Sequence, residues 1–383
     1  MAEYKKTGSC HALIVTGCMA QRYQKEIIEE VPEVDAVLGT TSYGDIVKAL
    51  EEAVAGNHFE EFRDIDYLPD TGSKRVLTTG GHFGYLKIAE GCDKHCTYCI
   101  IPKLRGKFRS VPMERLIAQA EDMAEQGVKE LILVAQETTV YGKDLYGKKS
   151  LHILLKKLCE IRGIRWIRIL YCYPEEIYDE LIETIRDEKK ICHYLDIPIQ
   201  HASDRILKRM GRRTSKQELV DIIGKLRKEI PDIVLRTTLI TGFPGETEED
   251  HEELKEFVDE MEFDRLGVFT YSPEENTPAA EMADQVPEEV KEERRDELME
   301  LQQEISYDRG QDRIGQELLV MIEGKVADES AYIGRTYGDA PKVDGYIFVQ
   351  TGELLMTGDF AKVRVTGALE YDLIGVLSDE YTE

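Results

Sequence analysis

The feature that most constrains the fold is an alternation of strand-like and helix-like segments between about residues 83 and 272. Apolar runs such as ELILVAQ (130–136) and VLRTTLITG (234–242) alternate with amphipathic runs such as PMERLIAQAEDMAEQ (112–126). This pattern is typical of buried parallel strands joined by helical crossovers. About six such βα repeats predict a parallel barrel or an open partial barrel. A doubly wound sheet stays open as the alternative.

The region before this repeat has a weaker α/β pattern. LIVTG (13–17) and VDAVLG (34–39) look like short buried strands, each followed by a helix-like run. Residues 57–80 are rich in charged residues and turn formers, which predicts a linker. Together they predict an N-terminal α/β region that is joined to the repeat by a polar connection.

The region after the repeat begins with a long, highly charged helix over 287–310. We expect its apolar positions to line one docking face: Val290, Leu298, Leu301 and Ile305. Strand-like runs with glycine turns follow it, among them ELLVMIEG (317–324) and YIFVQTG (346–352). They predict a small antiparallel β-barrel at the C-terminal end.

The charge balance limits the partners of the chain. Aspartate and glutamate number 75 against 49 lysines and arginines, a formal net charge of −26 over 383 residues. Such a field repels a nucleic acid backbone and attracts a basic partner, although a generic acidic surface would also keep the protein soluble. There is no apolar run long enough to span a membrane and no secretory signal, so we expect a cytoplasmic protein without a membrane partner.

Three cysteines, Cys92, Cys96 and Cys99, lie within the segment EGCDKHCTYCIIP (90–102), directly after the first strand of the repeat. Thiolates are the preferred ligands of iron–sulfur clusters. Three protein ligands on a four-iron cluster leave one iron open, as catalytic metal sites do. A structural zinc site is the alternative, but it normally requires four ligands, and His95 would serve as the fourth only with awkward geometry.

Other residues of chemical interest have plainer interpretations. Cys159, Cys172 and Cys192 lie singly in apolar or mixed surroundings and are interpreted as small buried residues. The stretch TGFPGET (241–247) contains glycines but lacks the lysine of a phosphate-binding loop. We interpret it as a tight strand-to-helix turn with Thr247 near the N-terminus of the helix.

The cysteine spacing on a partial βα barrel resembles the radical S-adenosylmethionine (SAM) superfamily, and within it the methylthiotransferases. Five stretches carry this resemblance: TGCMAQRY (16–23), IAEGCDKHCTYCIIPKLRGKFRS (88–110), LVAQETTVYG (133–142), LDIPIQHASDRILKRMGRR (195–213) and RTTLITGFPGETEEDH (236–251). The segments RGKFRS, AQETT and LYCYPEEI (170–177) resemble the RimO type, which modifies a ribosomal protein, more than the type that modifies transfer RNA.

The resemblance implies a four-iron, four-sulfur cluster held by the three loop cysteines. The open iron would chelate SAM, and an electron from the cluster would cleave SAM to a deoxyadenosyl radical. It also implies that Tyr98 lies against the adenine and that Gln136 and Arg236 contact polar groups of SAM. Each of the last two has a structural alternative, a turn cap for Gln136 and an ion pair with an acid for Arg236.

Methylthiotransferases carry three further cysteines in an N-terminal domain, for an auxiliary iron–sulfur cluster. Only Cys18 matches that pattern here, while Cys10, in KKTGSCHA, matches neither remaining motif. We therefore predict Cys18 as a metal ligand and an auxiliary 4Fe-4S cluster that is doubtful in this chain. Truncation of the sequence and ligands from a partner stay open as explanations. The expected parts of the chain are an incomplete N-terminal methylthiotransferase α/β domain plus linker (1–70), a radical SAM partial barrel (78–308) and a TRAM-like β-barrel (309–383).

The last part bears on the substrate. Residues 311–383 contain 14 acidic against 6 basic side chains, which disfavours RNA as a partner. The resemblance implies methylthiolation of an aspartate β-carbon on small-subunit ribosomal protein twelve, free or on the ribosome. A second SAM would supply the methyl group and a protein such as flavodoxin or ferredoxin the electrons. A transfer RNA adenosine methylthiotransferase that uses the basic runs KLRGKFR (103–109) or LKRMGRR (207–213), and a non-catalytic binding module stabilised by zinc, stay open as alternatives.

Overall fold

A computed structural model describes residues 1–68 and 75–378, which divide into two compact units. The first unit comprises Met1–Val76, Ala89–His95 and Cys99–Val111. The second comprises Leu77–Ile88, Cys96–Tyr98 and Pro112–Glu383. The expected parts 1–70, 78–308 and 309–383 stay predictions. Within the described residues, no helix is both long and apolar enough to cross a lipid bilayer.

The first unit contains a parallel sheet of three short strands in the order β1 (Ile14–Thr16), β2 (Ala36–Leu38) and β3 (Phe59–Glu61). The two strands expected within 13–17 and 34–39 are confirmed. Strand β3 lies in the segment 57–80 that was expected to be a linker, because the run FEE has a single apolar residue and no alternation to reveal it. The helices of the unit are α1 (Ala2–Thr7), α2 (Cys18–Tyr23), α3 (Glu26–Glu30), α4 (Ile46–Val54) and α5 (Ile101–Arg105).

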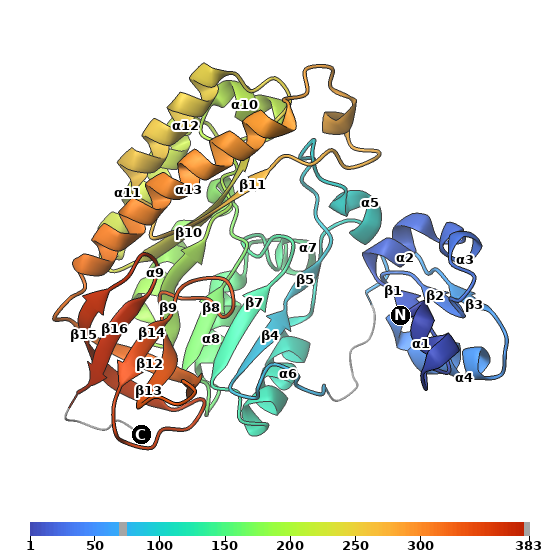
Figure 1. Ribbon diagram of the computed structural model, residues 1–383, viewed down its shortest axis with the longest axis horizontal. Helices are drawn as coiled ribbons and strands as arrows, with labels where there is room; N and C mark the ends of the chain where they lie inside the picture. Colours follow the sequence, from blue (N-terminus) through green and yellow to red (C-terminus); the bar gives the residue numbers. More distant parts are fainter. Residues whose placement is uncertain (69–74, 379–383) are drawn as a thin grey trace. The chain divides into compact units, whose positions relative to one another are not determined.

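The second unit is built on an open sheet of six parallel strands (Figure 1). In sheet order they are β4 (Phe83–Lys87), β7 (Glu130–Val134), β8 (Trp166–Ile169), β9 (Ile191–Asp196), β10 (Val234–Thr241) and β11 (Arg265–Thr270). Spatial order follows chain order without the reversal that a doubly wound sheet requires. The predicted open partial barrel is therefore confirmed, and the doubly wound alternative is wrong.

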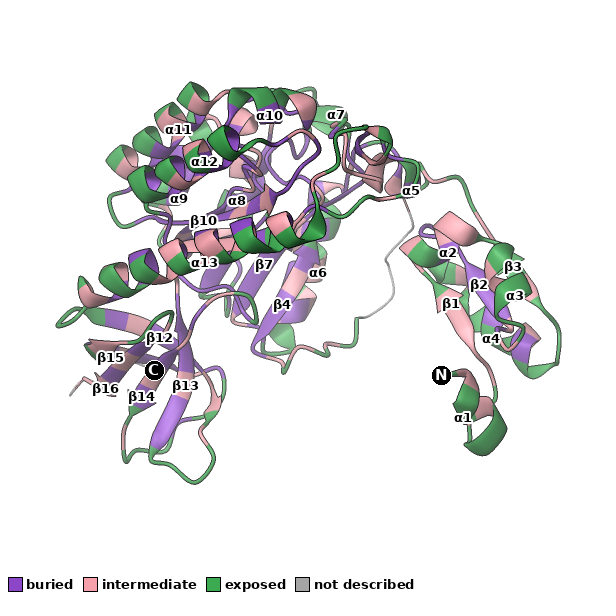
Figure 2. Cartoon of the chain, turned by 45° about the horizontal axis from the view of Figure 1, so that its top comes forward, coloured by how far each residue is buried: buried purple, intermediate pink, exposed green. Residues whose placement is uncertain are grey.

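Helices connect these strands and cover the sheet. They are α6 (Met113–Glu125), α7 (Lys143–Tyr146), α8 (Leu151–Cys159), α9 (Asp179–Asp187), α10 (Asp204–Arg209), α11 (Lys216–Glu229) and α12 (Glu248–Met261). Figure 2 shows the strands coloured largely as buried and the outward sides of α11 and α12 as exposed. This is the arrangement expected of strands covered by amphipathic helices.

The long charged helix is α13 (Glu288–Gln311), which contacts α12 and β11 (Figure 1). Leu298 and Ile305 are buried as expected, whereas Val290 and Leu301 are only half-buried. Polar side chains complete its buried face: Lys291, Arg294, Gln302 and Ser306. The predicted docking face was therefore right in position but is more polar than its apolar residues suggested.

The C-terminal strands close into a barrel in the order β12 (Glu317–Lys325), β13 (Ala331–Thr336), β14 (Ile347–Gln350), β16 (Leu373–Leu377) and β15 (Phe360–Ala368). The predicted small barrel is confirmed. One pairing differs from the antiparallel expectation, because β14 and β16 run parallel while the other pairs are antiparallel.

This barrel packs against one face of the six-stranded sheet. Ile132 of β7 and Trp166 of β8 share an apolar cluster with Met321 and Phe360 of the barrel. Trp166 meets Phe360 edge-on, with 4.8 Å between ring centroids. Successive side chains of a strand point to opposite faces of the sheet. The residues next to Ile132 and Trp166 in their strands therefore point to the face that the helices cover. The C-terminal barrel thus fills the inner side of the open sheet.

An ionic network whose centre is fully buried lies in this interface. Glu130, the first residue of β7, accepts a hydrogen bond from Arg168 Nε of β8 and another from Arg335 Nη2 of β13, both at 2.7 Å. Arg335 Nε also donates to Glu323 of β12 at 2.6 Å, and His82 lies 2.8 Å from the second oxygen of Glu323. Burial opposes the charge on Glu130, but the two guanidinium groups outweigh it and lower the pKa of the carboxyl.

We predict that Glu130→Gln lowers the free energy of unfolding by about 3–5 kcal/mol, because it removes the buried counter-charge of Arg168 and one of the two carboxylates that pair with Arg335. Urea denaturation followed by circular dichroism measures this effect. Exposed Glu329→Gln is the matched control and should change little. A stabilising carboxylate with a lowered pKa acts above its ordinary pKa, so the difference between wild type and Glu130→Gln should shrink as the pH falls through the lowered value. A loss equal to that of the control would contradict the assignment.

Candidate functional site

The second unit contains a cavity of about 370 Å³ at the C-terminal ends of the parallel strands. Gln136 follows β7, Tyr171 follows β8 and Asp196 is the last residue of β9, and all three line the cavity. Parallel barrels place their chemistry at this end of the strands. The volume falls within the range of about 300–1,000 Å³ that is typical of small-molecule sites.

The three residues that the sequence predicts as cofactor contacts meet in this cavity. Tyr98 comes from the end of the cysteine loop, Gln136 from the segment after β7 and Arg236 from within β10. They are far apart in the sequence, and only the fold brings them close together. The structure thus brings them to one cavity, and their contact with SAM stays a prediction.

Arg236 is held by two acids, which realises the ion-pair alternative for this residue. Its Nη1 donates to Asp196 Oδ1 at 2.7 Å and to Thr238 Oγ1 at 3.2 Å. Its Nε lies 3.3 Å from Asp344 Oδ1. Burial alone would lower the pKa of Arg236, but the neighbouring carboxylates raise it above its ordinary value. The cavity wall therefore carries a permanent guanidinium charge.

Asp344 and Tyr194 are site residues that sequence reasoning missed. Tyr194, in β9, lines the cavity, and its hydroxyl donates to Asp344 Oδ2 at 2.8 Å. Asp344 comes from the segment between β13 and β14 of the C-terminal barrel, whose Ala340 and Val343 also line the cavity. No short-range pattern links this segment to the sheet, so no signal in the sequence would have identified the pair.

Two cavity residues have an unusual backbone. Tyr171 and Gln200 have φ angles of +60° and +74°, a region that costs a residue other than glycine about 1–3 kcal/mol. Hydrogen bonds fix both: Tyr171 N donates to Asp196 Oδ2 at 3.1 Å, and Gln200 N donates to the Thr238 carbonyl at 2.9 Å. Such strain concentrates at functional sites.

Cys96 lies beside a residue of the cavity wall. Its Sγ is 3.6 Å from the hydroxyl of Tyr173, which lines the cavity. Thr97 anchors the segment, because its N–H donates to the carbonyl of Met210 and its hydroxyl to that of Arg209, both at 2.9 Å. Tyr98 then packs edge-on against Phe243, with 6.4 Å between ring centroids.

The rest of the cysteine loop belongs to the first unit. Cys92 N donates to the carbonyl of Gly106 at 3.2 Å, and its Sγ accepts from Lys94 N at 3.4 Å. Gly91 has a φ of +78°, and a Cβ there would overlap the carbonyl of Lys107. Only glycine satisfies both conditions, so the backbone conformation of the loop requires a glycine directly before the first cysteine.

The donor set of the loop fits a cluster-binding role. Cys92, Cys96 and Cys99 are free thiols, and the first two are buried. His95, the awkward fourth ligand of the zinc alternative, is exposed. Over residues 1–68 and 75–378, no group of three or more His, Cys, Asp or Glu is already arranged as a metal site. The three-cysteine ligand set therefore stays a prediction that rests on donor chemistry and spacing.

Cys18 begins helix α2 in the first unit, and its Sγ accepts a hydrogen bond from Arg105 Nε of α5 at 3.2 Å. Helix α5 directly follows the cysteine loop in the chain, so the fold brings Cys18 next to that segment. The Cys10 thiol instead donates to the carbonyl of Ala12 at 3.4 Å. The role of Cys18 as a metal ligand stays a prediction.

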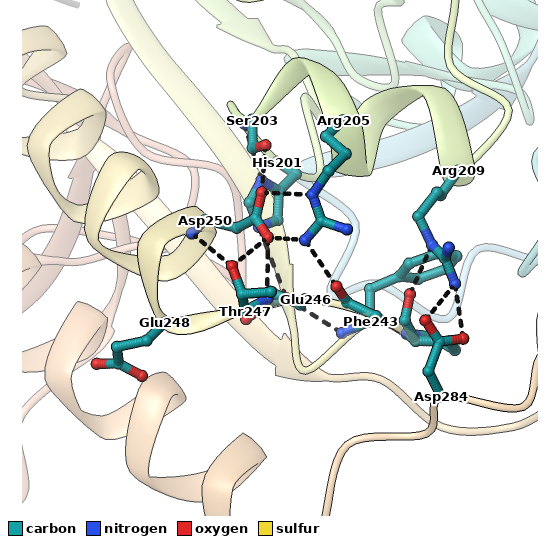
Figure 3. Close-up of polar contacts among 12 residues, drawn as sticks. His201, Ser203, Arg205, Arg209, Phe243, Glu246, Thr247, Glu248, Asp250 and Asp284 are labelled. Carbon is teal, nitrogen blue, oxygen red and sulfur yellow. Dashed lines mark hydrogen bonds and ion pairs between the residues drawn. The ribbon is translucent and has the colours of Figure 1, made fainter.

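The stretch TGFPGET forms the expected strand-to-helix turn (Figure 3). Thr247 caps α12 through a capping box, in which its hydroxyl accepts from Asp250 N and the Asp250 carboxylate accepts from Thr247 N. Gly242 and Gly245 both have positive φ angles. The Asp250 carboxylate also accepts from Ser203 and Arg205, which ties the turn to α10. The interpretation as a turn is confirmed.

The sequence model of the radical SAM superfamily matches residues 86–258, and that of the TRAM domain matches residues 314–377. Over 375 residues, which are 98% of this chain and 85% of the relative, the chain is 66% identical to the ribosomal protein uS12 methylthiotransferase RimO of Lachnoclostridium phytofermentans. It is 51% identical to the protein of the same name from Clostridium botulinum Eklund 17B, over 99% of this chain and 85% of the relative.

A solved structure, the radical SAM enzyme coproporphyrinogen III oxidase (HemN) from Escherichia coli, is similar at 17% identity with a TM-score of 0.47. The match covers 74% of this chain and 66% of that chain.

We predict that Cys172 and Cys192 resist alkylation in the native protein. Both are buried, and burial raises the pKa of each thiol to about 12. At pH 8 about one such thiol in ten thousand is ionised, and the thiolate is the reactive form. Mass spectrometry after brief treatment with iodoacetamide should find both unmodified, and modified once urea is added. Native labelling as fast as that of half-buried Cys10 would contradict this interpretation.

Proposed function

This chain belongs to the RimO family of radical SAM methylthiotransferases, and we propose from that premise that it transfers a methylthio group to ribosomal protein uS12. The acceptor in this proposal is the β-carbon of an aspartate. The observation that carries it is the convergence of Tyr98, Gln136 and Arg236 on one cavity with Cys96 beside its wall. Radical chemistry needs the cofactor close to the cluster ligands, and the position of Cys96 supports this proposal.

Cys92, Cys96 and Cys99 would hold the 4Fe-4S cluster. When bound, the cluster and SAM supply the radical that removes hydrogen from an unactivated carbon, a step for which no side-chain base is strong enough. Tyr98 presents its ring to the cavity while Phe243 fixes it, and Arg236 presents a guanidinium suited to a carboxylate. Gln136 adds an amide that can donate and accept.

The charges favour a basic protein over RNA. The net charge is −26, and the C-terminal part from 311 to 383 has 14 acidic against 6 basic residues. Within the two basic runs, Arg105, Arg109, Arg209 and Arg212 are engaged internally, whereas Arg213 is exposed. In the first run Arg109 pairs with Asp66, and in the second Arg209 pairs with Asp284 (Figure 3). Buried Arg212 donates to the Pro198 carbonyl and lies 4.4 Å from the Tyr173 ring centroid.

The remaining parts of the proposal concern partners that the chain would need. We propose Cys18 as a ligand of the auxiliary cluster, and a flavodoxin- or ferredoxin-like protein as the source of electrons. All eight cysteines are free thiols, which suits a reducing, cytoplasmic compartment. Docking on free uS12 and docking on the ribosome are both compatible with an acidic surface.

We predict that the anaerobically reconstituted protein forms 5′-deoxyadenosine from SAM and dithionite, and that purified uS12 stimulates this reaction while transfer RNA does not. Cys96→Ala should lower deoxyadenosine formation to the background rate, because it removes one of the three proposed cluster ligands. Cys159→Ala is the matched control, since Cys159 is a half-buried thiol on α8 outside the loop. Chromatography with mass detection quantifies the nucleoside and the methylthio group on uS12.

Unchanged cleavage by Cys96→Ala would overturn the proposed ligand set. Stimulation by transfer RNA alone would favour the transfer RNA alternative and overturn the charge argument. A colourless protein that contains zinc after anaerobic purification would favour the binding module.

A further inference from the structure

We propose that Asp344 is a positioning residue of the C-terminal barrel, which lies behind the wall of the cofactor cavity and fixes the orientation of Arg236. This inference rests on the proposed cofactor role of the cavity. It assigns to the barrel a part in building the site, in addition to any part in substrate docking. The residues that carry it all belong to the second unit.

The segment between β13 and β14 is anchored before it reaches the cavity. Asp339 accepts a hydrogen bond from Thr336 Oγ1 and another from Arg265 Nη2, both at 2.6 Å. Upstream, the carbonyl of Tyr337 accepts from buried Arg168 at 2.6 Å. These contacts hold the segment against β8 and β11, so the position of Asp344 is set by the docked barrel.

Asp344 is held on one side and faces Arg236 on the other. Its Oδ2 accepts from Tyr194 Oη and from Ala340 N, each at 2.8 Å. Its Oδ1 lies 3.3 Å from Arg236 Nε, and its side chain is only 3% exposed. The carboxylate therefore has one oxygen committed to the protein and one directed at the guanidinium.

Arg236 needs such a constraint because it separates two cavities. It lines the cofactor cavity and also a second cavity of about 370 Å³, which Arg265, Tyr346 and Asp344 line as well. A long side chain with open space on two sides can adopt more than one conformation. Asp196 holds Nη1 and Asp344 holds Nε, so the planar group has a single orientation.

That orientation leaves one nitrogen for a ligand. Across residues 1–68 and 75–378, Nη2 of Arg236 has no acceptor, and its neighbours Nε and Nη1 are both engaged. A guanidinium with two sides fixed and one side open is preorganised for a single anionic group, such as the carboxylate of an amino-acid ligand.

The substitution Asp344→Asn removes the negative charge of this side chain and keeps its other hydrogen bonds. Its amide oxygen can still accept from Tyr194 and Ala340, whereas its NH₂ group would face Arg236 in place of an anion. The experiment is a double-mutant cycle with Arg236→Gln, read out as the dissociation constant of SAM on anaerobically reconstituted protein. Asp359→Asn is the matched control, because Asp359 lies in the same barrel with a long 3.9 Å contact to Lys129.

We expect Asp344→Asn to weaken SAM binding about tenfold and Arg236→Gln to weaken it at least as much. The double variant should bind no more weakly than Arg236→Gln alone, because Asp344 acts through Arg236. The KM for SAM should rise while kcat at saturating SAM stays near wild type. Asp359→Asn should bind SAM as the wild type does.

Losses that multiply in the double variant would overturn the positioning role, and so would normal SAM binding by Asp344→Asn. Tyr194→Phe covers the case in which Asp344→Asn does not fold. It removes only the hydroxyl that holds Asp344 and should weaken SAM binding several-fold, with an unchanged melting midpoint of the cluster-free protein. Failure of the wild type to bind SAM would instead overturn the proposed function, and this inference with it.

Discussion

Arg168 and Arg335 share one buried carboxylate, that of Glu130, and this arrangement joins the C-terminal barrel to the six-stranded sheet. Charges buried in an interface tolerate little displacement, because each unpaired group carries a desolvation cost of several kcal/mol. The apolar contacts between Trp166 and Phe360 favour association, whereas the ionic network specifies one docking geometry. The position of every residue that the barrel contributes to the cavity depends on that geometry.

The cavity consequently has two sources. The strands supply Gln136, Asp196 and Arg236 at their C-terminal ends, in the manner of parallel barrels generally. The barrel supplies Ala340 and Val343, and Asp344 behind them. An open partial barrel of six strands leaves a gap that a closed eight-stranded barrel would not have, and the C-terminal barrel occupies the inner side of that sheet.

The sequence predicted the parts of this molecule whose signal is local. The alternation of apolar and amphipathic runs sufficed for the six strands, since buried parallel strands are nearly continuous in apolar residues. The family motifs placed Tyr98, Gln136 and Arg236, which the fold then brings to one cavity. Strand β3 was missed because its residues lack a periodic pattern.

The features that could not be predicted from the sequence depend on contacts between residues that are far apart in the chain. Glu130 and Arg168 are charged residues in strands, and nothing near them in the chain indicates that Glu130 pairs with Arg335 and that Arg168 donates to the Tyr337 carbonyl. The same holds for Tyr194 and Asp344. The basic runs likewise left an RNA-facing surface open as an alternative, and the sequence did not indicate that Arg109 and Arg209 pair with acids within the protein.

Because the cavity wall is built from two parts of the chain, these parts are synthesised at different times. A nascent chain that has just completed β11 already contains all six parallel strands and the cysteine loop. It still lacks Ala340, Val343 and Asp344, which emerge only with the last segment of the chain. Domains generally fold in the order in which they leave the ribosome. The cavity is therefore completed last. A chain that is released early would contain the cysteine loop but would lack the barrel residues that enclose Arg236.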